Sequence, residues 1–464
     1  MEKYDLQNRW KLEGRFLRYY GLRNKSHLFQ NTVRINAKQK ALINRLPSTL
    51  SDADLKILKP LLGVQIIPVE QKRFEPKKLS EARFCSNCIA NDFMIPGLEF
   101  DEDGQCPMCQ TRAETSNFKS IVPILNEFPR SKKSRFDVAV FYTGGKDSTY
   151  LLYYLSKKCN LRVLALTWEI PYMSDCAKKS IEGAKRTLDS VEFITRKISN
   201  DDLRTIYKTL YKLSGNTCAC PSLAYTLFYP ELVANKVPYF VTGNEPVQML
   251  GLYYNRMAPA FAYSFPHTKF FHFLINIGRV FTLHPPLKSG QFHTLATIKQ
   301  LAYGSNPLLK RSKYRNELVS NVTTAIHTLP SIVKPLKRAI RTSSWSGNIP
   351  AFAQVDLNEV CGGTYDWRTV KDVIERECGW VAPTQACKGL HTSCNIEKCK
   401  EHTQFKRFYE MQSSMIPFSA LEIALASRDK NLSRETALEE LEQSLGFSLE
   451  EIPECAIMRG YFQP

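Results

Sequence analysis

FDVAVFYTGGKDST, residues 136–149, joins a run of apolar residues to two adjacent glycines and then to charged and hydroxyl-bearing side chains. The apolar run predicts a buried strand, and the segment from Asp147 to about Lys158 predicts a helix. Adjacent glycines permit a sharp turn and let backbone N–H groups approach a ligand. Because a helix start also carries unpaired N–H donors and partial positive charge, the stretch predicts an anion-binding turn between a strand and a helix.

The residues that follow repeat this alternation of strand and helix. A helix is expected from 177 to 188, with Ser174 or Asp175 as its cap, and another lies around residues 225–235. Three further apolar runs predict strands: LRVLALTW (161–168), VEFITRKI (191–198) and VPYFVTG (237–243). Strands alternating with helices predict an α/β fold with a doubly wound parallel sheet, covered on both faces.

The turn carries the chemistry expected of a phosphate site. Thr143, Ser148 and Thr149 supply hydroxyl donors, and Lys146 supplies charge if its side chain turns inward. The spacing is not that of a Walker A loop, which needs four residues between the first glycine and a Gly-Lys pair. Residues 167–168 and 243–245 end two other predicted strands, so they are expected at the same carboxyl edge of the sheet, where open α/β folds bind ligands.

Four cysteines lie ahead of this unit in two close pairs. Cys85 and Cys88 form one C-x2-C pair, Cys106 and Cys109 form the other, and seventeen residues separate the pairs. Two such pairs can close a tetrahedral structural zinc site with no open position for chemistry. A redox or iron–sulfur role is the alternative.

The remaining cysteines suggest further sites. Cys218 and Cys220 precede a predicted helix, whose start would lower a thiol pKa, so they are candidate catalytic or metal-binding residues; packing near the cleft is the alternative. A second candidate metal set contains three thiols and two imidazoles: Cys387, Cys394, Cys399, His391 and His402. Three other cysteines are expected to be packing residues: Cys159, Cys176 and Cys455.

The charge of the chain is concentrated in two zones. The 464 residues carry a formal net charge of +18, yet residues 1–84 hold 18 Lys/Arg against 8 Asp/Glu, and residues 251–350 hold 13 against one. Such zones suit a polyanion, and RNA, an anionic membrane face and a nucleotide-linked substrate all remain open. In the second zone, residues 310–315 and 334–338 interleave charge with apolar residues, and Phe270, Phe271 and Phe273 would dip into a membrane surface. The alternative is that these basic residues form a solvated surface with no binding partner.

The composition and charge shifts divide the chain into five parts. The N-terminus has charges where a signal peptide needs an apolar run, so a cytoplasmic location is expected, with the inner membrane face as a further option. The parts are a basic N-terminal region (1–84), a zinc-binding knuckle (85–115), a nucleotide domain (130–250), a basic accessory insertion (251–350) and a helical C-terminal region with the Cys/His set (351–464).

The TGGKDS turn closely resembles the S-G-G-x-D-S loop of PP-loop ATP pyrophosphatases, with Thr143 in place of the first serine. The resemblance implies an adenine nucleotide alpha hydrolase-like fold in which the loop holds the pyrophosphate end of ATP with Mg²⁺. It implies nucleotide-binding roles for Thr143, Gly144, Gly145, Asp147, Ser148, Thr149, Thr167, Trp168 and Gly243. Candidate catalytic residues are Lys146, Asp147, Ser148, Cys218 and Cys220.

The chain is also similar to the N-acetyl sugar amidotransferase family of surface-polysaccharide and lipopolysaccharide biosynthesis. The similarity rests on CSNC and CPMC followed by TGGKDS, and then on residues 167–185 and 218–245. The likeness covers roughly residues 85–250 and 360–450. It implies that ATP adenylates an acetamido group of a nucleotide- or lipid-linked N-acetyl sugar. Ammonia from a glutaminase partner then displaces AMP to leave an acetamidino group. A sulfurtransferase that thiolates tRNA or a small metabolite is the alternative, and a non-catalytic ATP sensor is a third interpretation.

Overall fold

The structure is a computed structural model, and it describes residues 2–112, 123–214, 219–255, 268–304, 317–383 and 393–445. Cys218, Cys387, His391 and Cys455 lie outside the described residues, as does the basic segment 310–315. No helix of the described ranges is long and apolar enough to cross a membrane.

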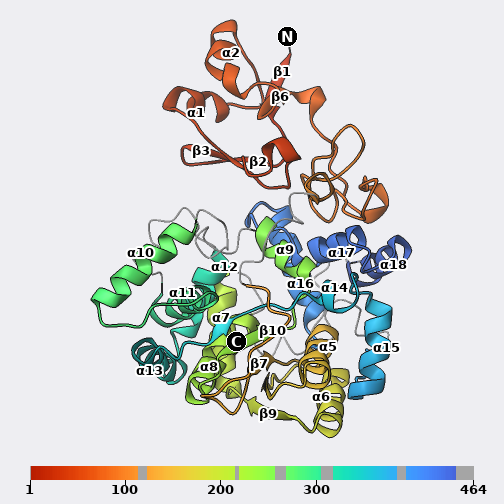
Figure 1. Ribbon diagram of the computed structural model, residues 1–464. Coiled ribbons are helices and arrows are strands. Elements are labelled where there is room, and N and C mark those ends of the chain that lie inside the picture. The colour runs from red at the N-terminus through yellow and green to blue at the C-terminus, as the bar shows by residue number, and fades with distance from the viewer. Residues whose placement is uncertain are drawn as a thin grey trace.

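A five-stranded parallel sheet forms the centre of the fold, as the alternating pattern predicts (Figure 1). Its strands are β7 (Val138–Phe141), β8 (Val163–Trp168), β9 (Val191–Arg196), β10 (Tyr239–Thr242) and β11 (Ala351–Phe352). Their order is β11-β10-β7-β8-β9, so the chain runs from β7 toward one edge through β9 and returns to the other side of β7 with β10. In open α/β sheets a ligand crevice lies at such a reversal, outside the carboxyl ends of the strands.

Helices cover both faces of this sheet because alternate strand residues point to opposite sides. Val138 and Val140 of β7 belong to one buried cluster, and Ala139 and Phe141 belong to the other. The first cluster is covered by α5 (Lys146–Tyr153), α6 (Asp175–Thr187) and α15 (Trp367–Cys378). The second is covered by α7 (Asn200–Ser214), α8 (Cys220–Ala234), α11 (Gln291–Tyr303), α12 (Glu317–Ile326) and α13 (Pro330–Ser346). The doubly wound parallel sheet is therefore confirmed.

Local signals match the expected element starts. α5 begins at Lys146, one residue before the predicted start, and a π-helical turn from Tyr154 to Lys158 continues it. Ser174 caps α6, since its side chain accepts a hydrogen bond from the Ala177 N–H at 3.2 Å. A serine in this position satisfies one of the unpaired donors at a helix start.

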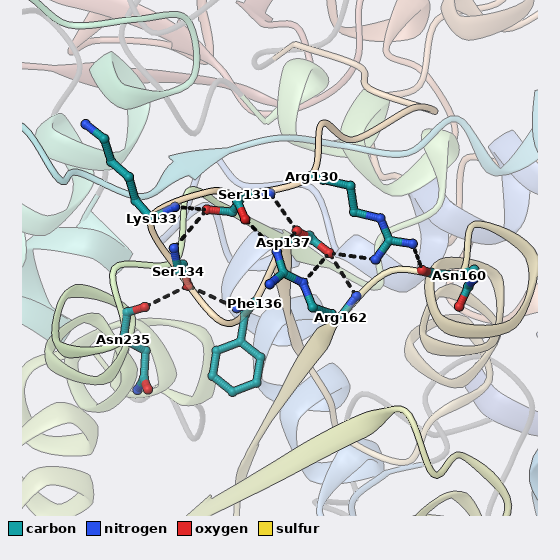
Figure 2. Close-up of polar contacts among 9 residues, drawn as sticks. All are labelled: Arg130, Ser131, Lys133, Ser134, Phe136, Asp137, Asn160, Arg162 and Asn235. Atoms are coloured by element: carbon teal, nitrogen blue, oxygen red, sulfur yellow. Dashed lines mark hydrogen bonds and ion pairs between the residues drawn. The ribbon is translucent and has the colours of Figure 1, made fainter.

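An ion-pair cluster fixes the amino end of the sheet, away from the phosphate turn (Figure 2). Asp137 is fully buried just before β7 and accepts hydrogen bonds from Arg130 (3.1 Å), the Ser131 N–H (2.6 Å) and the Arg162 side chain. Burial opposes ionisation, yet the hydrogen bonds from Arg162 and the backbone lower the pKa of Asp137 to about 2. The carboxylate thus ties the segment entering β7 to the start of β8.

The N-terminal part forms its own lobe above the sheet (Figure 1). It holds two three-stranded antiparallel sheets of orders β5-β1-β6 and β2-β3-β4, with a separate apolar core. Arg9 joins this lobe to the C-terminal helices, because its guanidinium donates to the carbonyls of Phe408 (2.6 Å) and Tyr409 (2.7 Å). The elements are β1 (Lys3–Leu6), β2 (Trp10–Glu13), β3 (Phe16–Tyr19), β4 (Thr32–Arg34), β5 (Ser48–Thr49), β6 (Ile66–Pro68), α1 (Ala37–Ile43) and α2 (Asp52–Leu58).

The C-terminal part is helical, as predicted, and packs beside α5 and the knuckle (Figure 1). Among its helices, α17 packs against both α9 and α18. The remaining helices are α3 (Pro107–Gln110), α9 (Pro246–Tyr254), α10 (Thr268–Phe281), α14 (Leu357–Val360), α16 (Glu397–Tyr409), α17 (Phe418–Arg428) and α18 (Arg434–Leu445).

Candidate functional site

The turn after β7 is a narrow bend whose shape requires glycine. Gly144 has φ +73°, and a Cβ there would lie 2.5 Å from the Ala177 carbonyl oxygen of α6. The Trp380 indole N–H donates to the Gly144 carbonyl at 3.1 Å and holds the bend from the other side. A side chain at residue 144 would therefore be excluded twice, by backbone conformation and by contact.

Three hydroxyl groups surround the start of α5. The Thr143 hydroxyl is 3.2 Å from that of Ser148, which also lies 3.4 Å from the Thr143 N–H. The Ser148 and Thr149 hydroxyls both donate to the Gly145 carbonyl, at 3.2 and 2.8 Å. Helix geometry leaves the N–H groups of residues 146–148 without intrahelical acceptors. The exposed Thr143, the buried Ser148 and these N–H groups thus form a donor-rich cradle for an anion.

Gly243 presses the end of β10 against this cradle. A Cβ at Gly243 would lie 2.5 Å from both the backbone nitrogen and the Cα of Ser148. Because β10 and β7 are neighbours in the sheet, this contact lies where the strand order reverses. The predicted phosphate turn and the end of the predicted strand 237–243 are therefore brought together, at the edge where open α/β folds bind ligands.

The end of β8 carries two buried polar groups without partners. Thr167 and Trp168 are 3% and 8% exposed, and within the described ranges the Thr167 hydroxyl and the Trp168 indole N–H have no hydrogen-bond partner. Such groups cost about 1–3 kcal/mol each when they remain unsatisfied. They lie on the strand next to β7, at the same carboxyl edge of the sheet as the cradle.

Lys146 and Asp147 lie in a buried network on the inner side of α5. The Lys146 ammonium pairs with Asp147 and, at 2.7 Å, with Glu245, and it lies 4.6 and 4.4 Å from the ring centroids of Tyr365 and Trp367. The Tyr365 hydroxyl donates to Asp147 at 2.9 Å, and the Trp367 indole N–H donates to Glu245 at 3.0 Å. In this structure the Lys146 ammonium is therefore shared between two carboxyl groups inside the protein.

Sequence reasoning assigned no role to the partners in this network. Glu245 follows β10 at the carboxyl edge of the sheet, where the sequence predicts a ligand site, so its position in the chain could have indicated a role. Tyr365 and Trp367 gave none, because more than two hundred residues separate them from Asp147. Together the three residues fix the start of α5 against β10 and α15.

The network predicts a specific pH dependence of stability. Burial and the neighbouring Asp147 raise the pKa of Glu245 from its usual 4.5 to about 8, although Lys146 opposes the shift. Between pH 4.5 and about pH 8, Glu245 keeps its proton in the folded protein but loses it in the unfolded chain. Raising the pH through this window therefore lowers the free energy of unfolding. Urea unfolding of Glu245→Gln across this window should show a flatter slope than the wild type. An unchanged slope would contradict the assignment.

Cys220 lies at the start of α8, as expected, beside two tyrosines. Its sulfur is 3.4 Å from the Tyr172 hydroxyl and 3.7 Å from the Tyr207 hydroxyl. Tyr172 also accepts the Asn395 N–H at its carbonyl (2.9 Å), and Met173 forms a β-bridge with Cys394. Cys220, Cys394 and Cys399 contact the same apolar cluster. Within the described ranges, however, they do not assemble into a candidate metal site, and Cys218, Cys387 and His391 lie outside those ranges.

The four knuckle cysteines do assemble as predicted. The sulfurs of Cys85, Cys88, Cys106 and Cys109 all lie within 4.8 Å of one another, and all four residues are buried. Backbone N–H groups of Asn87, Ala90 and Cys106 donate to the sulfurs of Cys85 and Cys88. Four converging thiols with N–H donors suit a metal held by thiolates, and this donor set fits Zn²⁺ and an iron–sulfur cluster alike.

The knuckle is attached to the C-terminal helices. Arg434 of α18 donates to the carbonyls of Cys85 (3.2 Å) and Cys88 (2.6 Å), and Arg428 of α17 donates to the Met108 carbonyl at 3.0 Å. These arginines join the cysteine knuckle to helices that are more than three hundred residues away in the chain.

We expect purified protein to carry one zinc ion per chain, measured by plasma mass spectrometry. Cys88→Ser should lose the metal and lower the melting temperature, because an incomplete tetrahedral site binds poorly. Cys159→Ser, which removes a cysteine outside the cluster, should change neither reading. Stoichiometric iron with acid-labile sulfide would show that the four cysteines hold an iron–sulfur cluster and not zinc. Metal-free protein with unchanged stability would contradict a metal site.

The chain matches no protein-family model and no curated protein. Two solved structures are similar over part of it. U34-tRNA thiolase NcsA from Methanococcus maripaludis, solved with its 4Fe-4S cluster, has 12% identity and a TM-score of 0.21, over 59% of this chain and 99% of its own. NH3-dependent NAD synthetase from Campylobacter jejuni subsp. jejuni NCTC 11168, in complex with the nitrate ion, has 20% identity and a TM-score of 0.20, over 52% and 94%. At these TM-scores neither likeness bears on the chemistry of this chain.

Proposed function

We propose that the protein is an ATP-dependent adenylating enzyme of the PP-loop type, which converts ATP to AMP and pyrophosphate. The observation that carries the proposal is the donor-rich cradle at Thr143 and Ser148, placed at the reversal of strand order and closed by Gly243. A helix start with free N–H groups and hydroxyls favours a chain of phosphates.

The cradle would hold the pyrophosphate end of ATP while an acceptor oxygen attacks the α-phosphate. Thr143 and Ser148 would donate hydroxyls to the phosphate oxygens, and the N–H groups of the first turn of α5 would stabilise the leaving pyrophosphate. Mg²⁺, when bound, would neutralise phosphate charge, while the Asp147 carboxylate stays paired with Lys146 and Tyr365 on the inner side of α5. Lys146 acts as a positioning residue, since its ammonium is held by Asp147 and Glu245.

The acceptor that the sequence resemblance favours is the amide oxygen of an N-acetyl sugar. Adenylation turns this oxygen, a poor leaving group, into part of AMP. Ammonia from a glutaminase partner then attacks the activated carbon, AMP departs with the former amide oxygen, and an acetamidino group remains. The carboxyl edge of the sheet at Thr167 and Trp168 is where the nucleoside of ATP would lie.

Thiolation is the second candidate, and one observation favours it. Cys220 contacts Tyr172, and Cys394 pairs with the neighbouring Met173, so two thiols lie on segments around the end of β8. Hydrosulfide bound there would attack the adenylated carbonyl carbon of a tRNA base or small metabolite. AMP would leave with the former carbonyl oxygen, and loss of the sulfur-bound proton would leave a thiocarbonyl group.

Oxygen-18 in the acceptor separates these functions. An N-acetyl sugar labelled at the amide oxygen, incubated with ATP, a glutaminase and glutamine, should transfer its label to AMP, and the sugar product should carry NH in place of oxygen. A product with sulfur in place of oxygen, formed from tRNA or a small metabolite, would establish thiolation instead. ATP binding without AMP formation with any of these acceptors would leave a sensor and contradict the proposal.

A further inference from the structure

Helix α10 turns its polar side toward the protein. His272 stacks on Phe292 with ring centroids 4.0 Å apart, and Asn276 makes two hydrogen bonds with the backbone of Leu287, at 2.7 and 3.0 Å. Arg279 donates to the carbonyls of Pro285 (2.8 Å) and Ser344 (3.3 Å). Because residues 272, 276 and 279 lie on one side of a helix, this contact side consists of polar residues.

The opposite side of α10 is apolar and exposed. The exposed fraction is 60% for Phe273, 84% for Phe281 and 81% for Leu283, which lies two residues beyond the end of the helix. The other exposed apolar residues of the helix are Phe270, Phe271, Leu274, Ile275, Ile277 and Val280. A surface helix normally buries its apolar stripe and shows its polar face to water. The reversal here indicates an interaction surface, since large exposed apolar patches mark binding sites.

Basic residues accompany this apolar face. Lys269 is exposed on α10 itself, and Lys334, Arg338 and Arg341 form an exposed stripe along α13. The stripe continues to Trp345, which is 60% exposed and contacts His284, with ring centroids 4.5 Å apart. Residues 251–350 contain a single acidic residue against 13 Lys/Arg. A surface with negative charge would complement these side chains.

We propose that α10 and the basic stripe of α13 dock the protein onto an anionic lipid surface. Such a surface offers an apolar layer for phenylalanine and leucine side chains and phosphate groups for lysine and arginine at the same depth. A second copy of the chain would bring two strongly basic regions together, which disfavours it. RNA would use the cations and the aromatic rings, but Leu274, Ile277 and Val280 have no stacking role on a nucleic acid.

Flotation of the full-length protein with lipid vesicles tests this proposal. The protein should float with vesicles of phosphatidylcholine and phosphatidylglycerol and much less with phosphatidylcholine alone, and high salt should weaken binding. Phe273→Glu together with Phe281→Glu should reduce the partition by about tenfold or more, because each phenylalanine leaves the lipid. The double variant Lys334→Ala, Arg338→Ala should bind the anionic vesicles less well, and its weak binding to phosphatidylcholine vesicles should not change.

Phe74→Glu is the matched control, because Phe74 is equally exposed but lies in the N-terminal part. This variant should bind vesicles like the wild type. Circular dichroism of each variant would show that the fold is retained, which is expected for exposed positions. Three outcomes would overturn the proposal: no binding to anionic vesicles, equal loss with Phe74→Glu, or sedimentation showing that α10 instead joins two copies or holds RNA.

Discussion

Replacing Gly243 with alanine is expected to lower the rate of AMP formation from ATP by about two orders of magnitude. The added Cβ would lie 2.5 Å from the backbone nitrogen and Cα of Ser148, so strand β10 and the start of α5 must move apart. Both atoms belong to the backbone and cannot rotate away. A shift of about 1 Å in groups that hold a reacting phosphate is enough for a loss of this size.

Gly251→Ala provides the matched control for this result. Gly251 is the sixth residue of the adjoining helix α9, and a Cβ there would have no heavy atom within 4 Å. This variant should retain wild-type activity and stability, or gain slightly from better helix propensity. Equal activity of Gly243→Ala and Gly251→Ala, with both proteins folded, would contradict the placement of the phosphate site against β10.

Replacing Lys146 with methionine is expected to lower the free energy of unfolding by about 3–5 kcal/mol, measured by urea denaturation. The ammonium is almost completely buried, and its removal leaves Asp147 and Glu245 close together without their cation. It also removes the contacts with the faces of Tyr365 and Trp367. The loss should be larger above about pH 8, where Glu245 is ionised, than at neutral pH, where Glu245 holds a proton.

Lys185→Met is the comparison for this variant. Lys185 pairs with Glu182 at 2.8 Å on the exposed side of α6. Exposed pairs of this kind contribute about 0–1 kcal/mol, so the change should be small. Similar effects of the two substitutions would mean that the buried network does not hold α5 in place.

Much of the sheet and the phosphate turn could be predicted because their signals are local. The apolar runs that became β7, β8, β9 and β10 are bounded by polar or turn residues, and Gly144 stands where the backbone requires a positive φ. The knuckle followed from cysteine spacing alone. In each case a few neighbouring residues carry the information.

The remaining features depend on contacts between distant segments. β11 contains only Ala351 and Phe352, and a run of two residues is too short to predict a strand. It is a strand because these residues pair with the edge of β10. The pairing of Lys146 with Glu245, and of Asp147 with Tyr365, joins residues that no periodicity connects. Phe270, Phe271 and Phe273 were singled out from the sequence, but the helix that carries them and its orientation were not, because only packing shows which side of a helix faces the protein.

The products of ATP turnover test the central claim most directly. With an acceptor present, the wild-type protein should form AMP and pyrophosphate in equal amounts. Ser148→Ala should lower this rate by about 10²-fold or more, since it removes a donor from the cradle, while Ser156→Ala on the turn that follows α5 should not. Formation of ADP and phosphate, or full AMP formation by Ser148→Ala, would contradict a pyrophosphate-binding turn at residues 143–149.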